Sequence, residues 1–85
     1  MADRHENTFR LVIASVSDTQ FDGAAVSATM PGTAGEFTVL LNHEPFVSTL
    51  KAGKITVRQS GGSQKEFAIN GGVVECSGER AIVLL

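Results

Sequence analysis

The residues best suited to chemistry gather in one short polar segment. Asn42, His43, Glu44 and Pro45 interrupt an apolar stretch, and His43 brings the one side-chain type that titrates near neutral pH. A serine or cysteine nucleophile needs a base within hydrogen-bond reach and a third group that orients that base. The other histidine, His5, lies in a polar N-terminal segment that we expect to be frayed. No catalytic triad is therefore predicted.

The spacing of the remaining polar residues disfavours metal binding and acid–base catalysis. His43 and Glu44 are adjacent and supply at most part of a metal-ligand set. Glu36 and Glu44 form a carboxylate pair only in principle, since no pocket or apolar wall that would raise one pKa is evident. The glycine pairs at 61–62 and 71–72 lack the spacing and the following Lys of a phosphate loop. We predict no catalytic residue, no metal and no cofactor.

Length and charge exclude further classes of function. The 85 residues are enough for one domain, and nine acidic against seven basic residues give a net charge of -2, which disfavours nucleic acid as a partner. No apolar run approaches the roughly 20 residues of a transmembrane helix, so we expect no direct membrane insertion. The opening residues mix acids and bases, unlike a signal peptide. Cys76, the only cysteine, fits a reducing compartment and is predicted to be a small buried apolar residue.

Short strands must position the polar segment, because no part of the chain keeps a 3.6-residue apolar period. Alternating or β-rich runs predict strands over eight segments: 9–16, 24–30, 36–41, 46–50, 54–58, 65–69, 73–76 and 80–85. Turn chemistry separates them at 31–35, 51–53, 60–63, 71–72 and 77–79. This spacing of strands and turns indicates an antiparallel sandwich or barrel. Residues 1–8 are predicted to form a flexible tail, and residues 9–85 one domain.

A run of ordered motifs goes beyond what periodicity shows. These motifs are Phe9-Arg-Leu-Val-Ile-Ala-Ser15, Phe21-Asp-Gly23, Gly35-Glu-Phe37, Asn42-His-Glu-Pro45, Leu50-Lys-Ala-Gly53 and Phe67-Ala-Ile-Asn-Gly-Gly-Val-Val-Glu75. In this order they resemble the N-terminal domain of the epsilon subunit of F-type ATP synthases, which is called delta in mitochondria. The resemblance covers residues 9–85. The His-x-Pro segment, the following Leu-Lys-x-Gly and the later Gly-Gly-x-x-Glu are its most specific parts.

The resemblance implies an all-β fold, a flattened antiparallel β-sandwich of about ten short strands. It also implies a non-catalytic rotor subunit in the central stalk, which links the gamma subunit to the ring of c subunits and couples proton flow to ATP synthesis. Carried over by position, the residues that face the c ring are Glu36, Asn42, His43 and Glu44. Those that face gamma are Ser15, Val47 and Ser48. Such a subunit would be monomeric when isolated and peripheral to the cytoplasmic face of a bacterial inner membrane, held there by the synthase.

Two departures and two alternatives accompany this reading. The family usually has Gly and Pro where this chain has Thr38 and Leu41, so the approach to His43 is expected to differ. The sequence ends at Leu85 with the last predicted strand, so the family's C-terminal helices, and the nucleotide binding and inhibitory switch associated with them, are not carried over. The alternatives are a generic β-sandwich interaction module unrelated to the synthase and a small enzyme with a β-barrel pocket.

Overall fold

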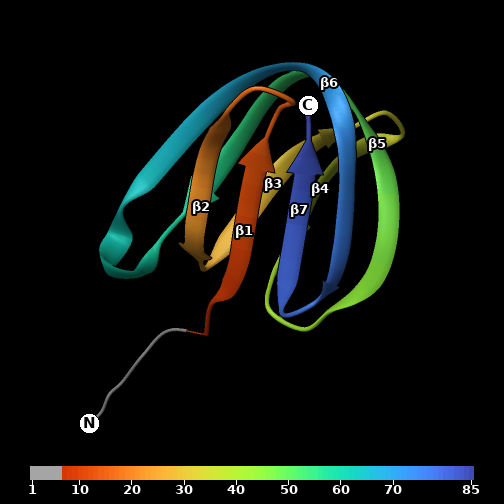
Figure 1. Ribbon diagram of the computed structural model, residues 1–85. Helices are drawn as coiled ribbons and strands as arrows, with labels where there is room; N and C mark the ends of the chain where they lie inside the picture. The colour runs from red at the N-terminus through yellow and green to blue at the C-terminus, as the bar shows by residue number, and fades with distance from the viewer. Residues whose placement is uncertain (1–6) are drawn as a thin grey trace, which may run out of the picture.

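The computed structural model of the chain describes residues 7–85, which form one sheet of seven strands (Figure 1). The strands are β1 (Phe9–Ala14), β2 (Thr19–Ala25), β3 (Ser27–Gly32), β4 (Gly35–Val39), β5 (His43–Arg58), β6 (Gln64–Gly78) and β7 (Arg80–Leu84). A single 3-10 turn, Ser60–Gly62, joins β5 to β6. The predicted all-β class is confirmed. Most of the predicted flexible tail, residues 1–6 with His5, lies outside the described residues.

The strand order is β2-β1-β7-β6-β5-β3-β4, and one neighbouring pair departs from the predicted antiparallel arrangement. β1 and β7 run parallel, with Leu11 opposite Ala81 and Ile13 opposite Val83, whereas the other pairs are antiparallel. A tight hairpin forces its two strands to be antiparallel, but β7 reaches β1 only after the chain has passed through all the other strands. The sheet is therefore mixed.

Two long strands replace four of the predicted short ones. β5 and β6 continue through the predicted turns at 51–53 and 71–72, and their pairing runs from Phe46 opposite Cys76 to Arg58 opposite Gln64. The glycines mark a bend and not a reversal. A Cβ atom on Gly72 would lie 2.6 Å from the carbonyl oxygen of Leu84, so a side chain would prevent the close approach of β7 at this point.

A second correction concerns the predicted single strand over residues 24–30, which is a corner between β2 and β3. At this corner the Val26 N–H donates to the Arg58 carbonyl oxygen at 2.7 Å, and from there the chain pairs with β5 instead of β1. Alternation alone does not show that the chain changes its pairing partner. With both corrections the described residues hold seven strands, fewer than the expected ten or so.

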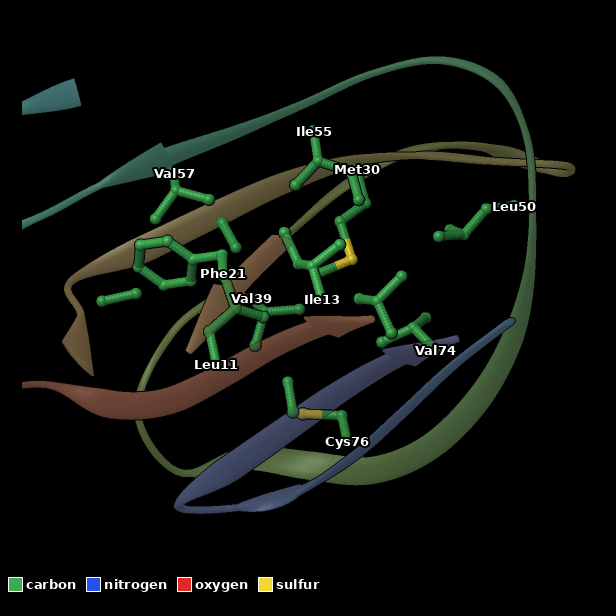
Figure 2. Packing of buried hydrophobic residues seen from close by; sticks show 14 of the residues in the cluster. Leu11, Ile13, Phe21, Met30, Val39, Leu50, Ile55, Val57, Val74 and Cys76 are labelled. Carbon is green, nitrogen blue, oxygen red and sulfur yellow. The ribbon is translucent and has the colours of Figure 1, made fainter. Parts of the chain in front are cut away.

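One apolar core unites both edges of this sheet. Phe21 of β2 and Val39 of β4 belong to the two edge strands, yet they lie in the same buried cluster (Figure 2). The sheet must therefore bend at β5 and β6 so that its two halves enclose the core (Figure 1). The fully buried large side chains come from six of the strands: Leu11, Ile13, Met30, Val39, Ile55, Val57, Val74 and Val83. Cys76 is 2% exposed, which confirms its predicted place.

Candidate interaction surfaces

The polar segment begins with a tight turn between β4 and β5. The His43 N–H donates to the Leu40 carbonyl oxygen at 3.1 Å, and Asn42 has a φ of 65°. This is the geometry of a type II turn, in which the third residue needs positive φ and Pro is favoured at the second, the place of Leu41. Asn tolerates that conformation better than other residues with a side chain. The departure at Leu41 is therefore compatible with a tight turn in front of His43.

The His43 side chain is held by the backbone and by an aromatic neighbour. Its Nδ1 lies 2.9 Å from the Glu44 carbonyl oxygen, and because that oxygen only accepts, Nδ1 carries the proton. The ring centroid lies 4.8 Å from that of Phe46, which in turn makes an edge contact with Phe37 at 5.4 Å. His43 is half-buried, while Glu44 is exposed. The imidazole is thus preorganised, with Nε2 as the nitrogen left for a partner.

A β-bulge shapes the start of β5. The register shifts between His43, which faces Gly78, and Phe46, which faces Cys76, so β5 has one residue more than β6 here. Pro45 lies in this irregularity, where the lack of an N–H costs no ladder hydrogen bond. On the other side of the turn, the Asn42 N–H donates to the Gly78 carbonyl oxygen at 2.9 Å. The polar turn is therefore tied to the β6–β7 turn.

The four residues predicted to face the c ring lie in two places. Asn42, His43 and Glu44 are consecutive at the β4–β5 turn. Glu36 is exposed near the start of β4, opposite Pro31 and next to the β3–β4 turn. These turns lie at opposite ends of β4 (Figure 1). The structure brings the first three residues together and leaves Glu36 apart from them.

The three residues predicted to face gamma also differ in orientation. Ser15 lies in the β1–β2 turn, where its N–H donates to the Asp18 carbonyl oxygen at 2.7 Å and its Oγ approaches the same oxygen at 3.3 Å. The Val47 side chain is 69% exposed. Successive side chains of a strand point to opposite faces, so Ser48 has the inward direction of its neighbours Phe46 and Leu50. Val47 and Ser48 cannot present their side chains to a partner on the same face.

An apolar outer face surrounds Val47, and it was not predicted. Val74 of β6 and Val83 of β7 are buried in the core. The residues next to them, Val73 and Leu84, point outward and are 39% and 58% exposed. Register places Leu84 beside Val73 and Ala14, and Ile82 beside Val12. We call this set the docking face: Val12, Ala14, Val47, Val73, Ile82 and Leu84. The sequence signals this face by the unbroken apolar run 81–85. A strand with one solvated face would instead alternate apolar and polar residues.

The outer face of the other half of the sheet is polar. The Oγ1 atoms of Thr29 and Thr38 lie 2.9 Å apart, and the Lys54 ammonium lies 3.6 Å from a Glu66 carboxylate oxygen. These side chains come from β3, β4, β5 and β6, on the solvent side of the core residues Ile55 and Val57. We call this surface the polar face, defined by Thr29, Thr38, Lys54, Glu66 and Ala68. Its residues are those of an ordinary solvated sheet.

The described part of the chain offers little for catalysis. A shallow hollow of about 640 Å³ lies where β1 begins, with Phe9, Leu41, Asn42 and Glu79 in its lining. Within residues 7–85 no group of three or more His, Cys, Asp or Glu residues is placed to hold a metal ion. No helix in the same range is long enough and apolar enough to cross a membrane. The features that call for an explanation are therefore surfaces: the docking face and the polar turn.

Fold and surfaces together define a small β-sheet domain with an exposed apolar face and a polar turn. Its residues 8–85 match the family model described as "ATP synthase, Delta/Epsilon chain, beta-sandwich domain". Because that match covers nearly the whole chain, the protein belongs to the delta/epsilon chain family of ATP synthases.

Relatives and solved structures agree with this assignment. The chain is 35% identical over 79 residues to an ATP synthase epsilon chain of Chlorobium limicola, covering 93% of this chain and 90% of that one. It is 37% identical over 76 residues to the Sulfurimonas denitrificans epsilon chain, with 89% and 58% covered. A chain in the solved mitochondrial ATP synthase of Euglena gracilis has the same fold, with a TM-score of 0.86 at 20% identity, covering 96% of this chain and 52% of that one.

A second solved structure extends the likeness in fold. A chain in the central stalk and c-ring structure of the Tetrahymena thermophila mitochondrial ATP synthase matches with a TM-score of 0.73 at 13% identity. That match covers 98% of this chain and 65% of the other. The chain therefore spans nearly all of the Chlorobium limicola chain but little more than half of the Sulfurimonas denitrificans and Euglena gracilis chains.

Proposed function

We propose that this protein is a non-catalytic subunit of the central stalk of an F-type ATP synthase, linking the gamma subunit to the c-subunit ring. The observation that carries this proposal is the docking face in a domain of the epsilon family. Large contiguous apolar patches are rare on soluble monomers, and where they occur they often mark interaction sites. As a rotor subunit, the chain would transmit rotation and so help to couple proton flow to ATP synthesis.

Gamma is the partner proposed for the docking face. Val47, one of the predicted gamma contacts, lies within this face, and Ser15 directly follows its member Ala14. We extend the proposed gamma contact to Val73, Ile82 and Leu84, because they lie on the same outer face. Since the Ser48 side chain has the opposite direction, a role for Ser48 in this contact runs through its backbone or through the edge of β5.

The c ring is the partner proposed for the polar turn and for Glu36. The turn is restrained, because a hydrogen bond from the Asn42 N–H joins it to the Gly78 carbonyl oxygen and Pro45 restricts the backbone that follows. A preorganised loop loses little entropy when it docks, which suits a joint that bears torque. Asn42, His43 and Glu44 supply one contact of this kind, and Glu36 supplies a separate one at the other end of β4.

The proposed location follows from these partners. The chain would be peripheral, on the cytoplasmic face of a bacterial inner membrane, and held there by gamma and the c ring. The core is closed within one chain, so the isolated domain is expected to be a folded monomer.

The deciding experiment combines binding with cross-linking. Purified gamma should form a complex with this chain, and failure to do so at micromolar concentrations would contradict the proposal. Single cysteines at Glu36 and at His43 should cross-link to the polar loop of the c subunit in reconstituted synthase, with a cysteine at Ala68 on the polar face as the matched control. Equal cross-linking at all three positions would remove the support for a c-ring contact at Glu36 and His43.

A further inference from the structure

One carboxylate lies among the apolar residues of the docking face. Glu75 of β6 faces Val47 on one side and Ile82 on the other, and Val73 lies two residues before it on the same outward side. Glu75 is exposed and points away from the core, because its neighbours Val74 and Cys76 are buried. A partner that covers Val47, Val73 and Ile82 must therefore cover the Glu75 carboxylate as well.

Nothing within residues 7–85 neutralises this carboxylate. Two other acids on the outer faces form ion pairs: Asp22 with Arg10 at 3.0 Å, and Glu66 with Lys54 at 3.6 Å. Glu75 takes part in no ion pair or side-chain hydrogen bond in this range. Arg80 on the neighbouring strand lies opposite Ser77 and thus diagonal to Glu75, at a typical separation of about 7–8 Å. The two side chains are not joined.

An unpaired carboxylate cannot be covered by apolar surface without a large cost. Removing an ionised group from water is strongly unfavourable unless a partner of opposite charge and hydrogen bonds compensate for it. If Glu75 had no partner cation, its carboxylate would therefore oppose docking of any partner that covers Val47, Val73 and Ile82. A cation on the partner compensates for the buried carboxylate. A partner that lacks such a cation binds less well, so the carboxylate gives specificity.

We propose that Glu75 is a specificity-determining residue of the docking face and that it binds a basic side chain, Lys or Arg, which gamma inserts between Val47 and Ile82. This inference rests on the proposed function, since it names the chemistry by which the same face recognises its partner. It adds a charged contact to a surface that is otherwise apolar.

The test uses the 85-residue chain and purified gamma, with association and dissociation rates measured separately. Glu75→Gln keeps the shape of the side chain and removes its charge. We expect it to weaken binding by about thirtyfold or more, and almost entirely through faster dissociation, as for the loss of one member of a buried charge pair. Glu66→Gln is the matched control on the polar face, and it should leave both rates within about twofold of the wild type.

Several results would overturn this assignment. Unchanged affinity of Glu75→Gln would show that the carboxylate needs no cation, and a change confined to association and its salt dependence would place Glu75 on a solvated rim. If Arg80→Gln weakens binding as much, and the double variant weakens it no further, the cation comes from this chain and not from gamma. Failure of the wild-type chain to bind gamma would instead refute the proposed function itself.

Discussion

The two outer faces of this sheet share the long strands β5 and β6, yet they differ in chemistry. On one side of the bend β5 and β6 carry Lys54 and Glu66 outward, and on the other side they carry Val47 and Val73. The inner faces of both halves are apolar and share one core. The stability of the fold therefore explains the inner residues of both halves and the polar face, but it does not explain the docking face.

This difference separates residues that serve folding from residues that we propose serve binding. Leu11 of β1 is fully buried on the inner face of the sheet. Leu84 of the neighbouring strand β7 is 58% exposed on the outer face. Identical side chains thus have different roles according to the face they occupy.

The largest effect is expected from the matched pair Leu11→Ala and Leu84→Ala. Truncating the buried leucine should lower the free energy of unfolding by about 2–5 kcal/mol, because it removes apolar burial and leaves a cavity. Truncating the exposed one should change it by no more than about 0.5 kcal/mol. Chemical denaturation of both variants measures these values. A similar loss in both would mean that the docking face belongs to the core.

Next in size is the effect of a charge on the docking face. Val47→Asp should weaken gamma binding by about a hundredfold, because the carboxylate would be buried against apolar surface without a partner. Ala68→Asp, on the polar face and opposite Lys54, adds the same charge and should leave binding unchanged. Calorimetric titration with gamma compares the two. If both variants bind alike, the apolar face is not where gamma docks.

A smaller effect is expected at the bend that separates the two halves. Gly72→Ala should destabilise the fold by about 1–3 kcal/mol, because the new methyl group would lie 2.6 Å from a backbone oxygen that cannot move freely. Gly53→Ala, at the same bend in β5, would meet only the Pro31 ring, at 3.1 Å and 3.2 Å, and should cost less than about 1 kcal/mol. Thermal melts rank the two variants, and the reverse order would contradict this view of the bend.

The sequence predicted the positions of strands and turns better than it predicted which strands pair and in which direction. Local patterns predicted strands over the segments that supply most of the core and a turn at 60–63, because these depend on neighbours in the chain. The parallel pairing of β1 with β7 and the corner at Val26 depend on which distant strand becomes a neighbour, which no local pattern records. The same is true of the docking face: its members come from four strands, and register alone brings them together.

The candidate residues divide in a similar way. Asn42, His43 and Glu44 were expected together because they are consecutive. Glu36 was grouped with them by resemblance, and the structure places it at the other end of β4. Val73 and Leu84 were predicted as strand residues without a face, since both faces of an apolar run look alike in sequence.

The smallest predicted effect concerns the ion pairs, one on the outer side of each half. The Arg10 Nε and Nη2 atoms each lie 3.0 Å from an Asp22 carboxylate oxygen, whereas Lys54 reaches Glu66 through one contact at 3.6 Å. The hydrogen bonds from Arg10 lower the pKa of Asp22 below its ordinary value of 3.8. A carboxyl group whose pKa is lower in the folded state stabilises the fold above its unfolded pKa, and this contribution is lost as the pH falls through the folded pKa.

Asp22→Asn should therefore reduce stability slightly at pH 7, and its difference from the wild type should shrink as the pH falls below about 4. The effect stays small because both side chains of the pair are well exposed, at 61% and 45%. Glu66→Gln should have a still smaller effect at pH 7, since its single longer contact is an ordinary surface pair. Denaturation curves at pH 7 and pH 3 for the three proteins measure this. A difference between Asp22→Asn and wild type that grows on acidification would show that Asp22 does not act through the charge it shares with Arg10.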